Sequence, residues 1–247
     1  MQRYAIKLSY KGTNYHGWQI QPNAITVQEE LEKAFSTLLK QEIAIVGCGR
    51  TDTGVHAVNY WAYMNVENLE GEMNTSSLVN KANGFLPKDI GIQEMKAVAN
   101  DWHARFDATH RTYEYKVNME KNPFLESASY FLPKTPNFDT MNEAAKFLLG
   151  KQDFECFSKS KTEVNNFLCE ISQAEWIKTE DGYSFFITAN RFLRNMVRAI
   201  VGTLLDIGFT KKGLKDIERI IASKSRSEAG FSVPAHGLYL VEIGYKW

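Results

Sequence analysis

The order of strand-like and helix-like segments along the first hundred residues restricts the fold more than any other feature of this chain. Hydrophobic residues alternate with period two where strands are expected and recur at helical spacing where helices are expected. The predicted strands cover residues 4–10, 43–48, 58–64 and 90–98, and the predicted helices cover 27–38 and 75–84. Strand, helix, strand, strand, helix, strand is the order of an antiparallel sheet with helices on one face.

Capping residues support both of these helices. Thr26 and Glu29 form a capping-box pair directly before the first helix. Asn74 is placed to cap the second helix, which should end near Gly84 and Pro87.

The second half of the chain follows the same pattern loosely, without a close sequence repeat. Strands are predicted over residues 109–118, 167–177, 183–188 and 238–245, and helices over 141–148, 192–205 and 214–223. We therefore predict an α+β protein of two ferredoxin/RRM-like subdomains, residues 1–104 and 105–247. Their antiparallel sheets should lie side by side, with helices on the outer face and a central cleft for an active site.

Composition limits the classes of protein to consider. Hydrophobic residues make up 44% of the chain, which is enough for a globular core. No apolar run approaches the roughly 20 residues that span a bilayer, and the first residues do not resemble a signal peptide. We expect a cytoplasmic protein with no membrane partner. Lys and Arg together number 29, as do Asp and Glu, so any nucleic-acid surface must come from local clusters of charge.

The cysteines and histidines do not form a pattern typical of a metal site or a disulfide framework. Cys48, Cys156 and Cys169 are an odd number without a C-x-x-C pair, and the five histidines are scattered. We expect the cysteines to be small buried hydrophobic residues. We predict no metal and no cofactor.

The segment Gly49–His56 carries the residues best suited to chemistry. Asp52 stands between two threonines, and Arg50 is close enough along the chain to favour the ionised carboxylate. A glycine-rich nucleotide loop would be followed by a helix, whereas a strand-like run follows here, so a dinucleotide or P-loop site is rejected. The simpler alternative is a hairpin turn in which Asp52 bonds its own backbone.

Three arginines form a second cluster. Arg191, Arg194 and Arg198 are three and four residues apart, so we expect them to share one helix face beside the apolar stripe of the predicted helix 192–205. Such a concentration of positive charge suits a phosphate or an enzyme carboxylate. The alternative is a solvated face beside a buried stripe.

Tyr113 and Arg105 are candidates for contact with a nucleic acid. Tyr113 lies on a predicted strand, where it is either a core residue or a ring that stacks on a flipped base. Arg105 precedes this strand and is placed to reach a phosphate.

Several blocks of the chain together resemble the TruA family of tRNA pseudouridine synthases. The blocks are residues 12–19, 26–31, 49–57, 103–106, 111–113, 192–198 and 236–240. They come in the family's order and span nearly the whole chain. Two departures are modest: Thr53 stands where many members have alanine, and residues 162–169 lack an arginine often found before the following strand.

The resemblance implies a homodimer of two-subdomain chains that converts uridine to pseudouridine at positions 38, 39 and 40, in the anticodon stem-loop of tRNA. Asp52 matches the catalytic aspartate and Arg198 its basic partner. Arg50 matches the arginine that helps expel the target nucleotide, Tyr113 the tyrosine packed on the uracil, and Leu238 the aliphatic residue under the base. Arg105, Arg191 and Arg194 are predicted to contact the substrate.

Two other functions remain open at this stage. One is a non-catalytic, RRM-like RNA-binding module, although no RNP1 pattern is present. The other is a glycoside-type hydrolase, which usually needs two facing carboxylates, and Asp52 has no evident partner acid.

Overall fold

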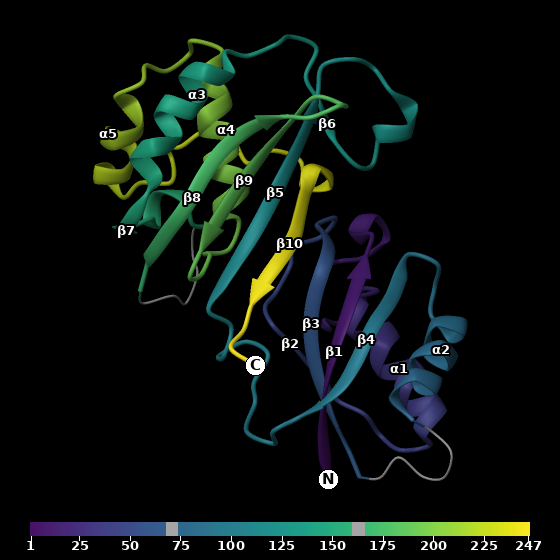
Figure 1. Cartoon of the computed structure of the whole chain (residues 1–247). Helices are drawn as coiled ribbons and strands as arrows, with labels where there is room; N and C mark the ends of the chain where they lie inside the picture. The colour runs from purple at the N-terminus through teal and green to yellow at the C-terminus, as the bar shows by residue number, and fades with distance from the viewer. Residues whose placement is uncertain (68–73, 160–165) are drawn as a thin grey trace. The chain divides into compact units, whose positions relative to one another are not determined.

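The computed structural model describes residues 1–67, 74–159 and 166–247, and its contacts divide the chain into two compact units (Figure 1). Unit 1 comprises Met1–Thr109 and Leu240–Trp247, and unit 2 comprises His110–Tyr239. Both units combine β-strands with α-helices, and the described residues form ten strands and five α-helices in all. The predicted α+β class is confirmed. Part of the segment 162–169 lies outside the described residues.

Unit 1 contains the predicted order of elements. Its strands are β1 (Gln2–Tyr10), β2 (Ile45–Gly47), β3 (His56–Val66) and β4 (Ile90–Val98), and its helices are α1 (Val27–Leu39) and α2 (Thr75–Phe85). β1 lies between β4 and β3 and is antiparallel to both, while β2 pairs with β3. β10 (Leu238–Gly244) is the next strand after β3 in the order, and its residues from Leu240 onward belong to unit 1.

Both helices of unit 1 begin where the capping signals predict. The Thr26 side chain accepts a hydrogen bond from the Glu29 backbone N–H, and the Asn74 side chain accepts one from Ser77. Each bond satisfies a donor that a helix start otherwise leaves unpaired. Helix α2 packs on β4 and contacts α1. The core includes the completely buried side chains of Ile6, Leu8, Leu31 and Phe35.

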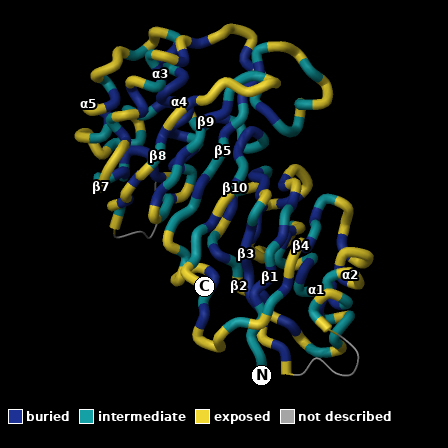
Figure 2. The backbone as a smooth tube through the Cα atoms, viewed as in Figure 1, coloured by how far each residue is buried: buried dark blue, intermediate teal, exposed yellow. Residues whose placement is uncertain are grey.

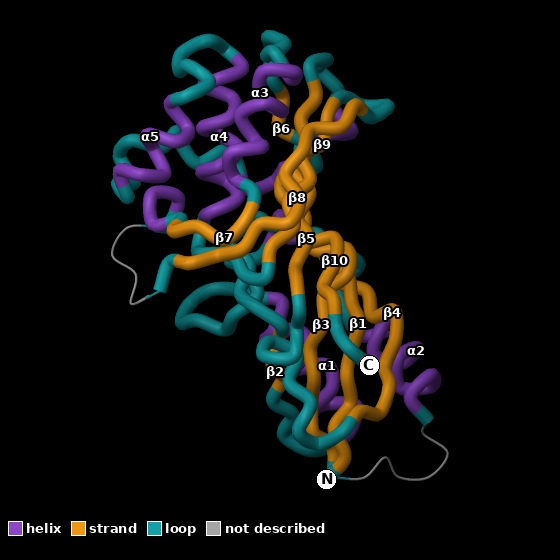
Figure 3. Tube along the Cα trace, turned by 60° about the vertical axis from the view of Figure 1, so that its left-hand side comes forward, coloured by secondary structure: helices purple, strands orange, loops and turns teal. Residues whose placement is uncertain are grey.

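Unit 2 contains strands in the order β5, β9, β8, β7, with neighbours antiparallel. Their bounds are β5 (His110–Asn118), β7 (Gly150–Asp153), β8 (Leu168–Lys178) and β9 (Tyr183–Ala189), and β6 (Tyr130–Phe131) pairs with β5. Helix α3 (Phe138–Ala145) packs against β8 and against α4 (Met196–Gly208), and α5 (Asp216–Ser223) follows α4. Figure 3 shows these helices together on one side of the strands.

Burial follows the strands and helix faces of each unit (Figure 2). In unit 2 the core includes Phe154, Phe157 and Phe185 together with Ile200 and Leu204, all fully buried. The side chains of all three cysteines are buried, as predicted. Among the described residues, no helix is long and apolar enough to cross a membrane.

Short elements of unit 2 were not predicted from the sequence. β6 has only two residues, and β7 has the polar sequence Gly-Lys-Gln-Asp, in which no hydrophobic alternation occurs. Both strands exist because a neighbouring strand supplies hydrogen bonds, and such pairing leaves no periodic signal in the short strand itself.

The predicted shared helix face of Arg191, Arg194 and Arg198 is wrong. Helix α4 begins at Met196, because Asn195 has a left-handed backbone conformation with φ 68°. Such a residue interrupts a right-handed helix. Arg191 and Arg194 therefore lie in the connection before α4, and only Arg198 is on the helix.

Candidate active site

Asp52 lies in the connection between β2 and β3, where the chain makes a tight turn. The Val55 backbone N–H donates to the Asp52 carbonyl oxygen over 3.1 Å, and Gly54 has φ 79°. Glycine at the third position with this φ is typical of a type II turn. Asp52 is half-buried, Arg50 is exposed, and Thr51 between them is buried. A strand follows the turn, as predicted, because β3 begins at His56.

The segment 12–18 packs directly against this turn. The Trp18 N–H donates to the Thr51 carbonyl oxygen over 3.4 Å, and the Gly54 N–H donates to the Tyr15 carbonyl oxygen over 3.3 Å. The Gly12 N–H donates to Nδ1 of the buried His56 over 3.0 Å. These bonds join the two blocks of sequence that contain Gly12 and Asp52.

Two glycines of the segment permit this close approach. A Cβ atom at Gly12 would lie 2.0 Å from the carbonyl oxygen of Val55. At Gly17 it would lie 2.2 Å from the carbonyl oxygen of Thr51, and the backbone there has φ 89°. Only glycine tolerates both the space and the conformation.

Two tyrosine side chains form hydrogen bonds with the Asp52 loop, and a tryptophan side chain stacks on one of them. The hydroxyl groups of Tyr10 and Thr51 are hydrogen-bonded over 2.8 Å, and the Tyr60 hydroxyl donates to the Gly49 carbonyl oxygen. Trp18 stacks on Tyr60, with ring centroids 4.1 Å apart. Burial raises the pKa of Tyr60, so its hydroxyl keeps the proton that it donates.

The sequence did not point to these supporting roles. Tyr10 and Tyr60 belong to alternating strand patterns, in which an aromatic residue signals only a buried face. Trp18 belongs to a block that resembles the TruA family, and the resemblance implies no particular role for it. The pairing of β1 with β3 brings Tyr10 and Tyr60 to the same region of the sheet, because Leu8 lies opposite Tyr60 and Tyr10 lies opposite Ala57.

Arg105 lies in unit 1 on a separate turn, between β4 and β5. Its backbone N–H donates to Nδ1 of His103 over 3.1 Å, and its guanidinium lies 5.7 Å from the centre of the Phe106 ring. The turn is closed by Asp107, whose carboxylate accepts from the His103 N–H over 2.7 Å. The Arg105 side chain is exposed.

Tyr113 lies in unit 2 on β5, opposite Ile187 of β9. Its ring is half-buried and meets Phe192 edge to face, with centroids 5.1 Å apart and planes at 90°. Tyr113 is therefore not a completely buried core residue. Phe192 orients its ring through a contact geometry that aromatic pairs favour.

Arg198 is held by the chain that leads into β10. Its Nε donates to the Val233 carbonyl oxygen over 2.7 Å, and the Val233 N–H donates to the Arg198 carbonyl oxygen over 3.3 Å. The Tyr115 hydroxyl donates to the Pro234 carbonyl oxygen over 2.8 Å, which anchors the same segment. Leu238 follows the 3-10 turn Ala235–Gly237, starts β10 and is buried.

Arg191 and Arg194 occupy different surroundings. Arg191 is half-buried, whereas the Arg194 side chain is exposed. The Arg194 carbonyl oxygen accepts from the Lys159 N–H over 3.0 Å. The predicted residues thus fall into two groups: Arg50, Asp52 and Arg105 in unit 1, and Tyr113, Arg191, Arg194, Arg198 and Leu238 in unit 2.

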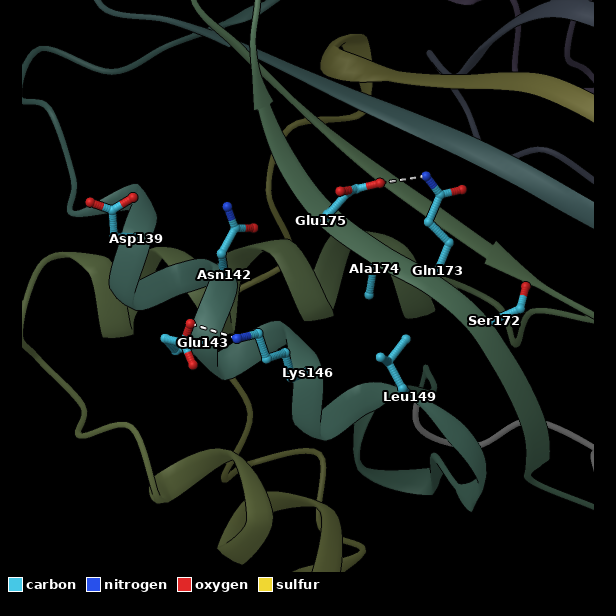
Figure 4. A pocket seen from close by; sticks show the side chains of 9 residues that line it. All are labelled: Asp139, Asn142, Glu143, Lys146, Leu149, Ser172, Gln173, Ala174 and Glu175. Carbon is cyan, nitrogen blue, oxygen red and sulfur yellow. Dashed lines mark hydrogen bonds and ion pairs between the residues drawn. The ribbon is translucent and has the colours of Figure 1, made fainter.

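Two hollows within unit 2 are lined by other residues. The larger, of about 670 Å³, lies between α3 and β8, and Figure 4 shows the nine side chains that line it. Two hydrogen bonds join four of its polar side chains, from Lys146 to Glu143 over 2.6 Å and from Gln173 to Glu175 over 2.8 Å. A second hollow of about 210 Å³ lies beside β5 and β9. The described residues contain no cluster of three His, Cys, Asp or Glu side chains suited to a metal ion.

A family model described as tRNA pseudouridine synthase matches residues 6–107 and 144–246. The matched segments contain the Asp52 loop, Arg105, the three arginines around the start of α4, and Leu238. Tyr113 lies between the two matched segments.

Proteins similar over nearly the whole chain carry a consistent name. The tRNA pseudouridine synthase A of Bacteroides thetaiotaomicron is 46% identical over 248 residues, which cover 99% of this chain and 91% of that protein. The protein of the same name from Parabacteroides distasonis is 46% identical over 245 residues, covering 99% and 96%. That of Bacillus licheniformis is 38% identical over 247 residues, covering 98% and 99%.

Proposed function

This chain belongs to the tRNA pseudouridine synthase family, and from that premise we propose that it isomerises uridine to pseudouridine at positions 38, 39 and 40 in the anticodon stem-loop of tRNA. We propose Asp52 as the catalytic carboxylate. The observation that carries the proposal is the loop of Asp52. It lies within the matched segment, and hydrogen bonds from three separate parts of unit 1 hold it.

The proposed reaction needs a carboxylate but no oxidant or energy source. The N1–C1′ bond of uridine breaks, the uracil turns, and C5 bonds to C1′. The hydrogen on C5 leaves as a proton and N1 takes up a proton, so the product is an isomer of uridine. Asp52 would act either as a nucleophile or as a base that removes a proton from the ribose. As a nucleophile Asp52 would attack C1′ or add to C6, and as a base it would lead to the glycal route.

The other predicted residues would bind and orient the nucleotide. The target base must leave its stack, at a cost of a few kcal/mol. Arg50, which is exposed on the same loop, would take part in displacing the nucleotide, and Tyr113 would pack on the uracil. Leu238 would lie under the base and Arg198 would pair with Asp52. Arg105, Arg191 and Arg194 would contact phosphates, where a guanidinium fits well.

We propose that the two units correspond to the two ferredoxin/RRM-like subdomains of the predicted fold, and that both contribute to one central site. A tRNA that carries 4-thiouridine at a target position tests this, because the thiobase cross-links to adjacent side chains when illuminated. Adducts on both the Asp52 loop and the Tyr113 strand would support the proposal. Adducts confined to one unit would contradict it.

The proposal also includes a homodimer that works in the cytoplasm. Light scattering at several concentrations would measure the mass in solution. A mass of twice the chain supports the dimer, and a mass equal to one chain at all concentrations contradicts it.

The decisive experiment uses tRNA with uridines tritiated at C5, because formation of the C5–C1′ bond releases this tritium. We expect release by the natural chain and none by Asp52→Ala. Thr53→Ala is the matched control from the same turn. Its side chain is exposed, and alanine stands there in many members of the family, so we expect it to release tritium close to the natural rate. Its free energy of unfolding should change by no more than about 0.5 kcal/mol, as for most surface changes.

Three results would contradict the proposal in different ways. Tritium release by a folded Asp52→Ala variant would remove Asp52 from the chemistry. Free uracil as the product would indicate a hydrolase. Binding of tRNA by the natural chain without any release would leave the non-catalytic RNA-binding module.

A further inference from the structure

The segment Gly49–Thr51 is held by side-chain hydroxyl groups on both sides of Arg50. The Tyr60 hydroxyl donates to the carbonyl oxygen of Gly49, the residue before Arg50. The Tyr10 hydroxyl bonds to the side chain of Thr51, the residue after it, over 2.8 Å. We propose that Tyr10 and Tyr60 are positioning residues that set the geometry of Arg50 and Asp52 for the reaction. This inference rests on the proposed function of Asp52.

The two tyrosines cannot easily move away from these partners. Tyr60 is 0% exposed and Tyr10 is 4% exposed. Trp18, at 2% exposure, stacks on Tyr60 at an interplanar angle of 24°, and the Tyr10 ring lies 5.6 Å from that of Tyr60. The three rings form one packed group, which we call the aromatic clamp. Because side chains in a packed interior hold their rotamers, the positions of both hydroxyl groups are well defined.

The aromatic clamp ties the position of the Asp52 loop to the sheet of unit 1. Asp52 and Arg50 belong to a connection, and connections are usually more mobile than the strands that they join. Here β1 supplies Tyr10 and β3 supplies Tyr60, so the rigid sheet of unit 1 determines where the loop lies. A site held by supporting hydrogen bonds on regular elements keeps its reacting groups within the narrow range that catalysis needs.

The test compares Tyr60→Phe and Tyr10→Phe with Tyr239→Phe. Each substitution removes one hydroxyl and keeps the ring. Tyr239 is a matched control in unit 2, because its hydroxyl donates to the Ala128 carbonyl oxygen over 2.7 Å. Loss of one such bond should lower the unfolding midpoint of each variant by about 2–4 °C.

We expect the clamp variants alone to lose activity. Misplacement of a catalytic group by about 1 Å can cost roughly 100-fold in rate. Single-turnover tritium release should therefore slow by about 10- to 100-fold in Tyr60→Phe and Tyr10→Phe, with the Kd for tRNA within about twofold. Tyr239→Phe should keep the natural rate constant.

A double-mutant cycle sharpens the test of the Tyr10 bond. Tyr10→Phe, Thr51→Val and the double variant all break the same hydrogen bond, so their rate losses should be equal rather than multiplied. Multiplied losses would show that the two hydroxyl groups act separately and would overturn the role assigned to the bond.

The remaining outcomes are also decisive. Natural rates in folded Tyr60→Phe and Tyr10→Phe overturn this inference while the proposed function stands. A loss of rate that matches that of Tyr239→Phe assigns the tyrosines to stability alone and overturns it as well. A natural chain that releases no tritium overturns the proposed function, and this inference with it.

Discussion

At the scale of single residues, Gly17 shows how closely the Asp52 loop is packed. Its φ of 89° is a conformation that side chains rarely adopt, and a Cβ atom would meet the Thr51 carbonyl oxygen. By contrast, a Cβ atom at Gly49, in the same loop region, would meet no atom within 4 Å, and its φ lies outside this unfavourable range. The backbone conformation and the packing thus require glycine at position 17 but not at position 49.

We predict that Gly17→Ala lowers the free energy of unfolding by about 1–3 kcal/mol, the usual cost of a strained backbone. Gly49→Ala should change it by no more than about 0.5 kcal/mol. Urea denaturation followed by fluorescence measures both. Equal losses in the two variants would contradict the packing described for Gly17.

At the scale of elements, the start of α4 separates residues that the sequence pattern places together. Asn195 ends the preceding connection in a left-handed conformation, and its side chain donates to the Ser232 hydroxyl over 2.6 Å. Arg194 is exposed before the helix, whereas Arg198 is held on the helix by Val233. Arg194 and Arg198 should therefore perform different tasks.

We predict that Arg194→Ala weakens tRNA binding and lowers the slope of log affinity against log salt by about 1, as expected for one lost phosphate contact. The rate constant at saturating tRNA should stay unchanged. Arg219→Ala removes the same charge from an ion pair with Asp216 and Glu228 and serves as the control. An unchanged salt slope in Arg194→Ala would contradict the phosphate contact.

A further prediction concerns Asn74, the N-terminal cap of helix α2 in unit 1. The Asn74 side chain accepts from the Ser77 N–H over 2.8 Å at the exposed start of α2. Replacing Asn74 with alanine should cost about 0.5–2 kcal/mol of unfolding free energy. Asn74→Ser should restore most of it, because serine also caps helices. A thermal melt of both variants measures the difference, and equal destabilisation would argue against the cap.

At the scale of the whole molecule, the last residues of the chain complete its first unit. The Thr109 N–H donates to the Gly244 carbonyl oxygen over 2.8 Å, and the Asn59 side chain donates to the Val241 carbonyl oxygen over 2.7 Å. The Trp247 ring lies 3.1 Å from Nζ of Lys96 and stacks near Trp102. Unit 1 is thus formed from both ends of the sequence.

We predict that removal of residues 240–247 destabilises unit 1 more than unit 2. The affected backbone and side chains are hydrogen-bonded and packed, so this terminus should not tolerate truncation. Hydrogen exchange should speed up along β1 and β3, while β8 and β9 serve as the internal control. Uniform loss of protection in both units, or no loss in either, would contradict this division of the chain.

The sequence alone determined features that depend on local pattern. The strands and helices of unit 1, the caps Thr26 and Asn74, and the burial of the cysteines follow from spacing and side-chain type, which act over a few residues. Resemblance to the family supplied the roles of Asp52, Arg50, Tyr113, Arg198 and Leu238, whereas Arg105, Arg191 and Arg194 were assigned from their charge and their positions in the sequence. Those roles stay predictions until the tritium and binding experiments test them.

Only the tertiary structure decided the features that depend on contacts between distant residues. The hydrophobic pattern continues through Asn195. In the structure, however, Asn195 has a left-handed conformation and donates a hydrogen bond to Ser232, and helix α4 begins only after it. The hydroxyl of Tyr60 meets Gly49, and Gly17 meets Thr51, because the strands and the segment 12–18 bring them together. Residues 240–247 join unit 1 for the same reason. Hydrophobic periodicity predicts which face of a helix or strand is buried, but it does not predict which other segment packs on that face. The Asp52 loop depends on such packing, by β1, β3 and the segment 12–18.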